Sequence, residues 1–322
     1  MNTQNHELIT RSALARLPAG FPLSDGQHDA VVMGNILSDA NLGSSGVHCD
    51  NCAFAEGAAR ILACRRAIES EPDRFGVRSL RAFGGLLHTV QDFYAHSNWI
   101  ELHKGLSEMP LWDWDQSTLP GGILSGTILQ EEPKRCAQGT PDHILVNKDS
   151  ISSEQGKKVV SEGPNKGKTF FELAFEAAVE ASILRVNELV RGVECFRITT
   201  RTGESLFSGT DAQVFIILHG REKDTGRILL DNPGIDDFER GRTDTFIVGT
   251  TAGIGDIERI TIGFEAEEGL FPGWHLEEVL VEEASGRVDE DMSGRGAKRF
   301  RCGRWLARNK GDGKTVVELR PE

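Results

Sequence analysis

The stretch Leu87-His88-Thr89-Val90-Gln91-Asp92-Phe93-Tyr94-Ala95-His96 decides how the N-terminal part of this chain is interpreted. It lies in a strongly apolar run, from Ser79 to Leu102, that is typical of a helix. His88, Asp92 and His96 follow one another at intervals of four residues. Each such step turns only about 40° around a helix, so all three side chains project from one face.

Three such polar groups on an apolar helix are unfavourable to bury without a partner. A divalent cation removes that penalty, and histidine together with aspartate suits zinc. The alternative is one or two hydrogen-bonded core histidines beside a structural carboxylate, which would explain a single histidine better than three groups in one stripe. Seven of the nine histidines precede residue 144, which also places the chemistry in the N-terminal half.

The composition is that of a globular protein, with 322 residues, 39% hydrophobic and 26% charged. The net charge of −13 disfavours nucleic acid and, unless cations intervene, an anionic membrane. No apolar run approaches the roughly 18 residues of a membrane span, and the first residues lack the features of a secretory signal. We therefore expect a cytoplasmic protein, or one exported by a dedicated secretion system, with peripheral membrane action.

A change in hydrophobic periodicity predicts two domains, 1–192 and 193–322. Helical periodicity marks 54–68, 79–102 and 169–190, whereas 104–167 lacks periodicity and is typical of a functional loop or lid. Short alternating runs follow Gly192, at 195–200, 212–218, 244–248, 257–264, 275–283, 298–302 and 315–319. The pattern predicts an all-α domain followed by an all-β sandwich of about eight strands.

Six cysteines are too few for a disulfide scaffold. Cys49 and Cys52, with Cys64 beyond them, could form half of a zinc ribbon, but the other half is missing. We therefore expect mainly buried or partly buried free thiols.

Four N-terminal motifs resemble the Het-C group of proteins, which is similar to zinc-dependent phospholipases C and zinc-dependent single-strand nucleases. The resemblance covers about 5–190, and the motifs are 6–14, 34–39, 48–57 and 85–99. It implies an all-α phospholipase C-like domain with up to three zinc ions. The implied zinc ligands are His6, Asp39, His48, His88, Asp92, His96, His143 and Asp149.

In this resemblance Asp92 bridges two ions, and Asp39 is both a ligand and the catalytic base. The sequence departs from the family at three points. The family also uses a mature N-terminal amine as a ligand, and no cleavage that would create one is evident here. His103 competes with His96 for the third ion, and Asn147 stands where a glutamate is expected, which leaves Asp149 as the substitute.

Three C-terminal motifs, 209–216, 231–246 and 271–279, resemble a PLAT domain, the eight-stranded sandwich attached to lipoxygenases, lipases and clostridial α-toxin. The resemblance implies lipid binding. A candidate calcium loop comprises Asp231, Asn232, Gly234 and Asp236, with an Asx/Pro turn as the alternative. Candidate lipid-inserting residues are Phe207, Phe271 and Trp274, of which Trp274 is equally expected in the core.

These features predict a zinc-dependent phospholipase C that hydrolyses the glycerol–phosphate bond of phospholipids at membranes, as a secreted toxin or effector. Catalysis would rest on Asp39 and Asp92, with zinc activating a water molecule. Two alternatives remain: a non-catalytic membrane-binding Het-C-type protein and a zinc-dependent single-strand nuclease. The expected partner is a phospholipid membrane or micelle and not nucleic acid; protein partners are not indicated.

Overall fold

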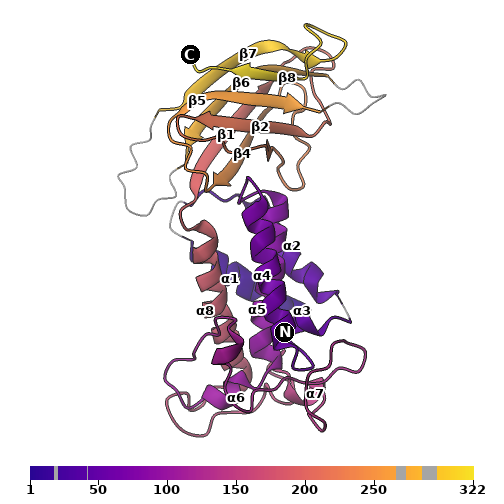
Figure 1. The fold of residues 1–322 in the computed structure, drawn as a ribbon, viewed down its shortest axis with the longest axis vertical. Coiled ribbons are helices and arrows are strands. Elements are labelled where there is room, and N and C mark those ends of the chain that lie inside the picture. The colour runs from indigo at the N-terminus through magenta and orange to yellow at the C-terminus, as the bar shows by residue number, and fades with distance from the viewer. Residues whose placement is uncertain (18–20, 42, 266–272, 285–295) are drawn as a thin grey trace. The chain divides into compact units, whose positions relative to one another are not determined.

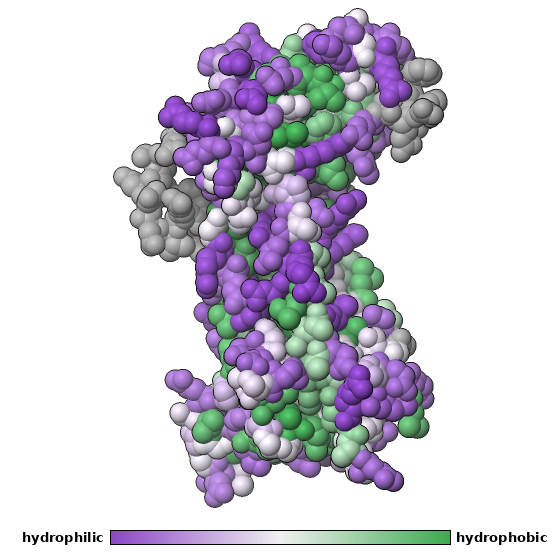
Figure 2. Space-filling model, viewed as in Figure 1, coloured by the Kyte–Doolittle hydropathy of each residue, from purple (hydrophilic) through white to green (hydrophobic). Residues whose placement is uncertain are grey.

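The computed structural model describes residues 1–17, 21–41, 43–265, 273–284 and 296–322. The chain forms two compact units (Figure 1). The first, which we call the helical unit, comprises Met1–Leu17, His28–Ile68 and Leu80–Arg191. The second, the sandwich unit, comprises Gly192–Glu322 and two earlier segments, Pro18–Gln27 and Glu69–Ser79. On the face shown in Figure 2, polar side chains cover much of each unit, with apolar patches between them.

The described helices include the three predicted at 54–68, 79–102 and 169–190, and two short ones lie in the stretch 104–167, which lacks helical periodicity. They are α1 (Thr3–Leu14), α2 (Asp25–Asp39), α3 (Ser45–His48), α4 (Phe54–Ser70), α5 (Val77–His96), α6 (Trp99–His103), the 3-10 helix η1 (Gln116–Thr118), α7 (His143–Val146) and α8 (Phe170–Val190). Helix α8 begins with a capping box between Thr169 and Glu172, in which each side chain accepts from the other residue's backbone N–H. Among the described residues, no helix combines the length and apolar character needed to cross a bilayer.

Helix α5 packs closely against α2 because glycines lie at their crossing. A Cβ atom added to Gly84 would lie 2.0 Å from the carbonyl oxygen of Val31, and one added to Gly34 would lie 2.2 Å from that of Arg81. The two backbones therefore approach to a distance that no larger residue permits. This crossing brings Asn35 of α2 beside His88 of α5.

The predicted helix over 79–102 is interrupted at Ser97 and Asn98, between α5 and α6. The Ser97 hydroxyl donates to Phe93 O, and Asn98 N donates to Leu124 O. The Asn98 side chain bonds the same connection, since Leu124 N donates to its Oδ1. Tertiary hydrogen bonds thus end the helix directly after His96.

The sandwich unit has two antiparallel sheets, as predicted. One has the order β4-β1-β6-β7 and the other β3-β2-β5-β8. The strands are β1 (Glu194–Thr202), β2 (Val214–Gly220), β3 (Ile228–Leu229), β4 (Thr243–Thr250), β5 (Ile257–Phe264), β6 (Gly273–Glu283), β7 (Lys298–Ala307) and β8 (Val316–Leu319). Alternate residues such as Phe196, Ile216, Ile260 and Phe300 fill the space between the sheets.

Candidate functional site

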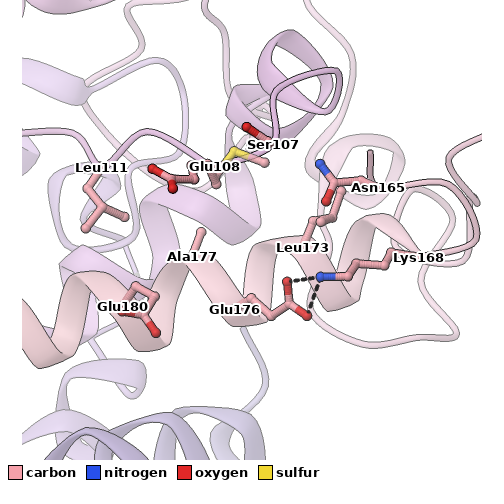
Figure 3. A pocket seen from close by; sticks show the side chains of 10 residues that line it. Ser107, Glu108, Leu111, Asn165, Lys168, Leu173, Glu176, Ala177 and Glu180 are labelled. Carbon is pink, nitrogen blue, oxygen red and sulfur yellow. Dashed lines mark hydrogen bonds and ion pairs between the residues drawn. The ribbon is translucent and has the colours of Figure 1, made fainter. Parts of the chain in front are cut away.

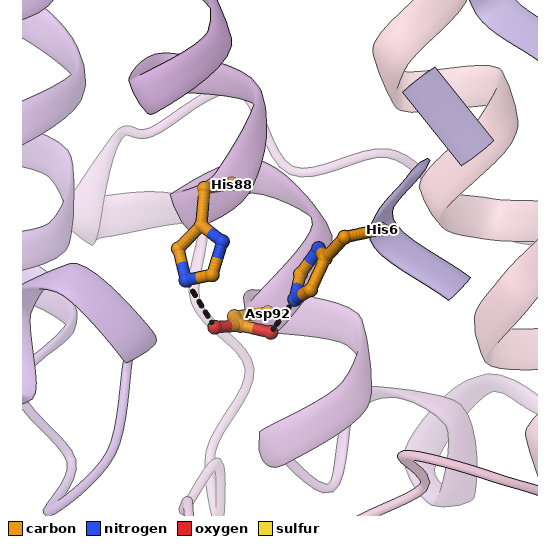
Figure 4. Close-up of side chains that lie close together, drawn as sticks. All are labelled: His6, His88 and Asp92. Carbon is orange, nitrogen blue, oxygen red and sulfur yellow. Dashed lines mark ion pairs between the residues drawn. The ribbon is translucent and has the colours of Figure 1, made fainter. Parts of the chain in front are cut away.

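The buried carboxylate of Asp92 on α5 is the centre of a histidine cluster in the helical unit. Its Oδ2 lies 3.0 Å from His48 Nδ1 and 3.0 Å from His88 Nε2. Its Oδ1 lies 3.1 Å from His6 Nε2 and 3.6 Å from His96 Nε2. Figure 4 shows His6 and His88 pointing to opposite oxygens of this carboxylate. Side chains from α1, α3 and α5 therefore converge on one bridging group.

The other nitrogen of each imidazole lies against a hydrogen-bond acceptor. The pairs are His6 Nδ1 with Gln91 Oε1 at 2.7 Å, His88 Nδ1 with Asn35 Oδ1 at 3.2 Å, His48 Nε2 with Asn41 O at 3.3 Å, and His96 Nδ1 with His48 O at 2.9 Å. The amides of Asn35 and Gln91 are themselves oriented, because their nitrogens donate to Thr10 Oγ1. These acceptors favour a hydrogen on the outer nitrogen of each ring, the one that faces away from Asp92, so that each ring in its neutral form turns the lone pair of its inner nitrogen towards Asp92.

Lone pairs that face one another need a cation between them. His88 Nε2 and His48 Nδ1 are only 3.2 Å apart, although each ring uses its other nitrogen as a donor. Within the described ranges, the buried His6 Nε2 also makes no hydrogen bond of acceptable geometry. Imidazole lone pairs together with carboxylate oxygens are the donors that zinc prefers. The residues present therefore fit a bound zinc ion.

The protonation equilibria differ between the rings. Burial would lower the pKa values of His48 and His96, but the neighbouring Asp92 carboxylate raises the pKa of His48 and holds that of His96 well above its usual range, so a bound ion would have to displace a proton from these two rings. Burial lowers the pKa of His88 to about 4, so this ring is neutral at pH 7, the form that binds metal. Burial alone would raise the pKa of Asp92, but the positive groups around it, His96 first, hold that pKa well below its usual range. Asp92 is therefore ionised.

A second group of ligands lies around His96. Its Nε2 is 3.0 Å from Asp149 Oδ1, and His143 Nε2 is 3.5 Å from Asp149 Oδ2. The amino group of Met1 lies 3.2 Å from both Asp149 Oδ1 and His96 Nε2. His103 is not part of this group, because its Nδ1 is hydrogen-bonded to Trp99 O at 2.8 Å. The structure thus brings His96, and not His103, together with His143 and Asp149.

Asp50 is a member of this cluster that the sequence analysis missed. Its Oδ1 lies 2.8 Å from His143 Nδ1, and its Oδ2 lies 3.4 Å from His96 Nδ1. A carboxylate behind a histidine, on the side away from the metal, orients the ring and makes it a stronger ligand. Asp50 therefore contacts the Nδ1 atoms of both His96 and His143, while the Nε2 atoms of the same rings face Asp149.

The remaining implied ligand, Asp39, also lies at the cluster. Asp39, His48 and His88 each offer a ligand atom within 4.8 Å of the others. Asp39 Oδ2 accepts a hydrogen bond from Thr3 Oγ1 at 2.5 Å. All eight implied zinc ligands therefore lie in one region of the helical unit, although they are distant in the sequence.

A disulfide supports the turn that carries Asp50. Cys52 is bonded to Cys136, so the expectation of free thiols is wrong for these two residues. The pairing could not be predicted from the sequence, because the two cysteines are 84 residues apart and only the fold brings their segments together. Asn51 adds to the link, since its backbone carbonyl accepts from Arg135 N at 2.7 Å. Asp50 thus directly precedes two cross-links to the segment before α7.

The predicted calcium loop of the sandwich unit adopts the alternative turn structure at Asn232. Its backbone N–H donates to Asp237 Oδ2 at 2.8 Å, and its Nδ2 donates to Asp237 Oδ1 at 2.9 Å. Gly234 supplies the positive φ of 76° that this turn requires. The carboxylates that converge are instead Asp211, Asp236 and Glu239, whose ligand atoms lie within 4.8 Å of one another. Asp236 is thus close to Asp211, and Asp231 is not part of the group.

The candidate lipid-binding residues differ in exposure. Phe207 is 76% exposed, and its neighbour Leu206 is 64% exposed. Trp274 is fully buried and donates its indole N–H to Thr202 Oγ1 at 2.9 Å, so its assignment as a lipid-inserting residue is wrong. Its alternative assignment to the core is the one that the structure supports. Phe271 lies outside the described residues.

Comparison with known proteins identifies the sandwich. Residues 196–318 match the PLAT/LH2 domain family. This region is a PLAT domain. It is 35% identical over 125 residues to human lipoxygenase homology domain-containing protein 1, a match that covers 38% of this chain and 6% of the relative. A match to the human polycystin family receptor for egg jelly is 31% identical over 113 residues and covers 35% of this chain and 5% of the relative. The chain thus spans about a twentieth of the length of these relatives.

Solved structures give lower similarity. A coral 8R-lipoxygenase is 24% identical with a TM-score of 0.31, over 39% of this chain and 17% of that one. The α-toxin from Clostridium absonum is 12% identical with a TM-score of 0.31, over 98% of both chains.

The helical unit matches a different family from the one that its motifs resemble. Residues 28–120 match the VWA7 N-terminal domain, and the Het-C and phospholipase C relationship is not confirmed. The curated relatives match through the PLAT domain and are not phospholipases by name. The prediction of a zinc-dependent phospholipase C is therefore wrong, and its alternative, a non-catalytic membrane-binding protein, has the better support. The prediction of a secreted toxin or effector rested on that activity and has no support from these comparisons.

Proposed function

We propose that this chain is a non-catalytic, peripheral membrane-binding protein whose PLAT domain docks on phospholipid through two adjoining loops. The observation that carries the proposal is the exposure of apolar side chains at both loops. Leu206 and Phe207 lie on the first, and Ile235, which is 51% exposed, lies on the second. Burying a phenylalanine or leucine side chain contributes about 1.5–3 kcal/mol, enough for reversible attachment when several act together.

Hydrogen bonds hold the two loops together. Thr210 N donates to Phe238 O at 3.2 Å, and Arg240 Nε donates to Glu204 O at 2.8 Å. Phe207 has a φ of 64°, a conformation that a bulky residue adopts only where its surroundings impose it. The exposed Phe207 is therefore held in place before any lipid is bound.

Calcium completes the proposed docking surface. A cavity of about 250 Å³ lies between the loops and includes Asp211 and Asp236 in its lining. With Glu239 they form an acidic group that repels anionic phospholipid. Calcium prefers such oxygen ligands, and a bound ion would offset most of the negative charge of these carboxylates and bridge to a lipid phosphate.

The experiment is co-sedimentation with vesicles of phosphatidylcholine and phosphatidylserine, with calcium or with EGTA. Phe207→Ser should lower the partition coefficient by at least tenfold, and Asp211→Asn should remove the calcium dependence. Leu62→Ser is the matched control, because Leu62 is 45% exposed but lies on α4, outside the PLAT domain. Unchanged binding of Phe207→Ser would refute the docking surface.

In the same proposal, the histidine cluster binds zinc as a structural centre. Zinc would neutralise the ionised Asp92 and join α1, α3 and α5, which each contribute ligands. Elemental analysis should find zinc in the purified protein, up to the three ions that the motifs imply, and Asp92→Asn should reduce the content and the melting temperature. Hydrolysis of phospholipid or single-stranded nucleic acid that disappears in Asp92→Asn would overturn the non-catalytic proposal.

A further inference from the structure

The helical unit has a cavity of about 460 Å³ that is separate from the histidine cluster. Figure 3 shows it between the segment that carries Glu108 and Leu111 and the first half of α8. The size lies within the range of small-molecule sites. The floor is apolar, because Leu173 and Ala177 of α8 are buried beneath it and Leu111 closes one side.

The polar groups around this floor are mostly hydrogen-bond acceptors. Glu108, Glu176 and Glu180 supply three carboxylates to the lining, and Lys168 is the one cation in it. Lys168 Nζ is already bonded to both oxygens of Glu176, at 2.9 and 2.7 Å (Figure 3). Among the described residues, no hydrogen bond or ion pair is found for the carboxylates of Glu108 and Glu180. Both residues are exposed, so the edge of the cavity carries two solvated negative charges that no described cation pairs with.

A buried amide adds a fixed acceptor. Asn165 is only 8% exposed and lines the cavity. Its Nδ2 donates to Lys104 O at 3.0 Å and to Leu106 O at 2.8 Å. These two bonds orient the amide and assign the nitrogen, so that Oδ1, which has no partner within the described ranges, is left to accept from a ligand.

An anionic ligand does not fit this cavity. The beginning of α8 could attract an anion through its free backbone N–H groups, but the Thr169–Glu172 capping box occupies that end. The carboxylates of Glu108 and Glu180 would repel a phosphate or carboxylate placed on the floor. A ligand that donates hydrogen bonds and carries positive charge is complementary to the whole lining.

We propose that this cavity binds a small organic amine, with its protonated amino group beside the carboxylates of Glu108 and Glu180 and its hydrocarbon part on Leu173 and Ala177. This site is independent of the lipid docking and of the metal centre. A primary amine matches the lining better than a quaternary one, because the carboxylates and Asn165 Oδ1 are acceptors for N–H groups, which a quaternary amine lacks. The same group occurs in free alkylamines and in lysine side chains.

The experiment titrates the full-length protein with n-hexylamine, followed by saturation-transfer NMR and calorimetry. Hexanol and hexanoate serve as neutral and anionic probes of the same length, and an acetylated lysine tripeptide presents the amine on a peptide. We expect hexylamine to bind at least tenfold more tightly than hexanol and hexanoate not to bind. Stronger binding of the tripeptide than of hexylamine would assign the site to a peptide lysine, and the reverse to a free amine.

Two variants locate the binding. Glu180→Gln and Glu108→Gln should each weaken hexylamine about threefold, and together about tenfold, while hexanol is unaffected. Glu162→Gln is the control, since Glu162 is an exposed carboxylate outside the cavity. The exposed substitutions should leave the circular dichroism melting curve unchanged. Equal binding of hexanol and hexylamine, or full binding by the double variant, would overturn the proposal.

Discussion

Replacing Lys148 by methionine tests whether this buried cation fixes the position of the segment after α7 that carries Asp149. Lys148 is 0% exposed although it lies between two candidate ligands. Its Nζ donates to Ser97 O at 2.7 Å and Val146 O at 3.2 Å, and it pairs with Glu101 Oε1 at 3.3 Å. Its backbone N–H donates to Ala95 O at 2.8 Å. Lys148 thus ties the segment that continues into Asp149 to the end of α5.

The magnitude follows from what the substitution leaves behind. Methionine keeps most of the side-chain volume, so no large cavity forms, but two carbonyls and a carboxylate lose their donor. Breaking a buried ion pair from one side costs about 3–5 kcal/mol. Glu101 remains 17% exposed and keeps a 2.6 Å hydrogen bond from Gln155 Nε2, which places the expected loss near 3 kcal/mol, the lower end of that range.

Urea unfolding followed at 222 nm in EDTA measures this loss without a contribution from bound metal. With a typical dependence on urea of about 2–3 kcal/mol per molar, the midpoint should fall by about 1 M. Lys157→Met is the matched control, because Lys157 makes an exposed pair with Glu154 at 2.8 Å and should change stability by less than about 1 kcal/mol. If Lys148→Met shifts the midpoint no more than Lys157→Met, the reasoning is refuted.

Three further predictions address other parts of the molecule. Burial raises the pKa of Asp73 to about 7. Its proton therefore stabilises the folded state fully below about pH 4, and this stability is lost as the pH rises to about 7. Asp73→Asn keeps the acceptor for the backbone N–H groups of Phe75 and Gly249 and should remove the decline of the urea midpoint over this pH range. Gly84→Ala places a Cβ 2.0 Å from Val31 O and should cost about 3 kcal/mol by the same assay; an unchanged midpoint would contradict the close crossing. Asn35→Leu removes the acceptor of His88 Nδ1 and should weaken zinc about tenfold to a hundredfold in chelator competition, while an unaltered affinity would argue against ligation by this ring.

Hydrophobic periodicity was sufficient to predict the main helices and strands, but not where each one ends or which distant residues it contacts. The alternation of apolar residues predicts the sandwich, and helical spacing predicts α4 and α8. The break after His96 depends on two hydrogen bonds between Asn98 and Leu124, one in each direction, and Leu124 is distant in sequence. Similarly, Gln27 Nε2 donates to Phe75 O at 3.0 Å and to Ile247 O at 2.8 Å. These contacts join the two early segments of the sandwich unit to each other and to β4, and no periodic signal predicts them.

The candidate metal centre could be predicted where its ligands share one helix face. His88, Asp92 and His96 meet that condition, but Asp50 lies in a turn where Asn51 has a positive φ of 52°, so no spacing rule points its side chain towards a histidine. A weaker signal was available for Asn35. An amide on the buried side of an apolar helix needs a partner, and here that partner is a histidine.

The ligand motif led to the wrong reaction because it reports which donors meet and not what the bound ion does. In the proposed structural centre, Asp39, His48, His88 and Asp92 would supply four protein donors to one ion, the number typical of a structural tetrahedral zinc site. A catalytic site keeps one position open for water, and whether it does so depends on groups such as Asp50 and Asp149 that no motif on α5 specifies. A helix that concentrates metal donors is therefore evidence for a cation, and any reaction has to be argued from the groups around that cation.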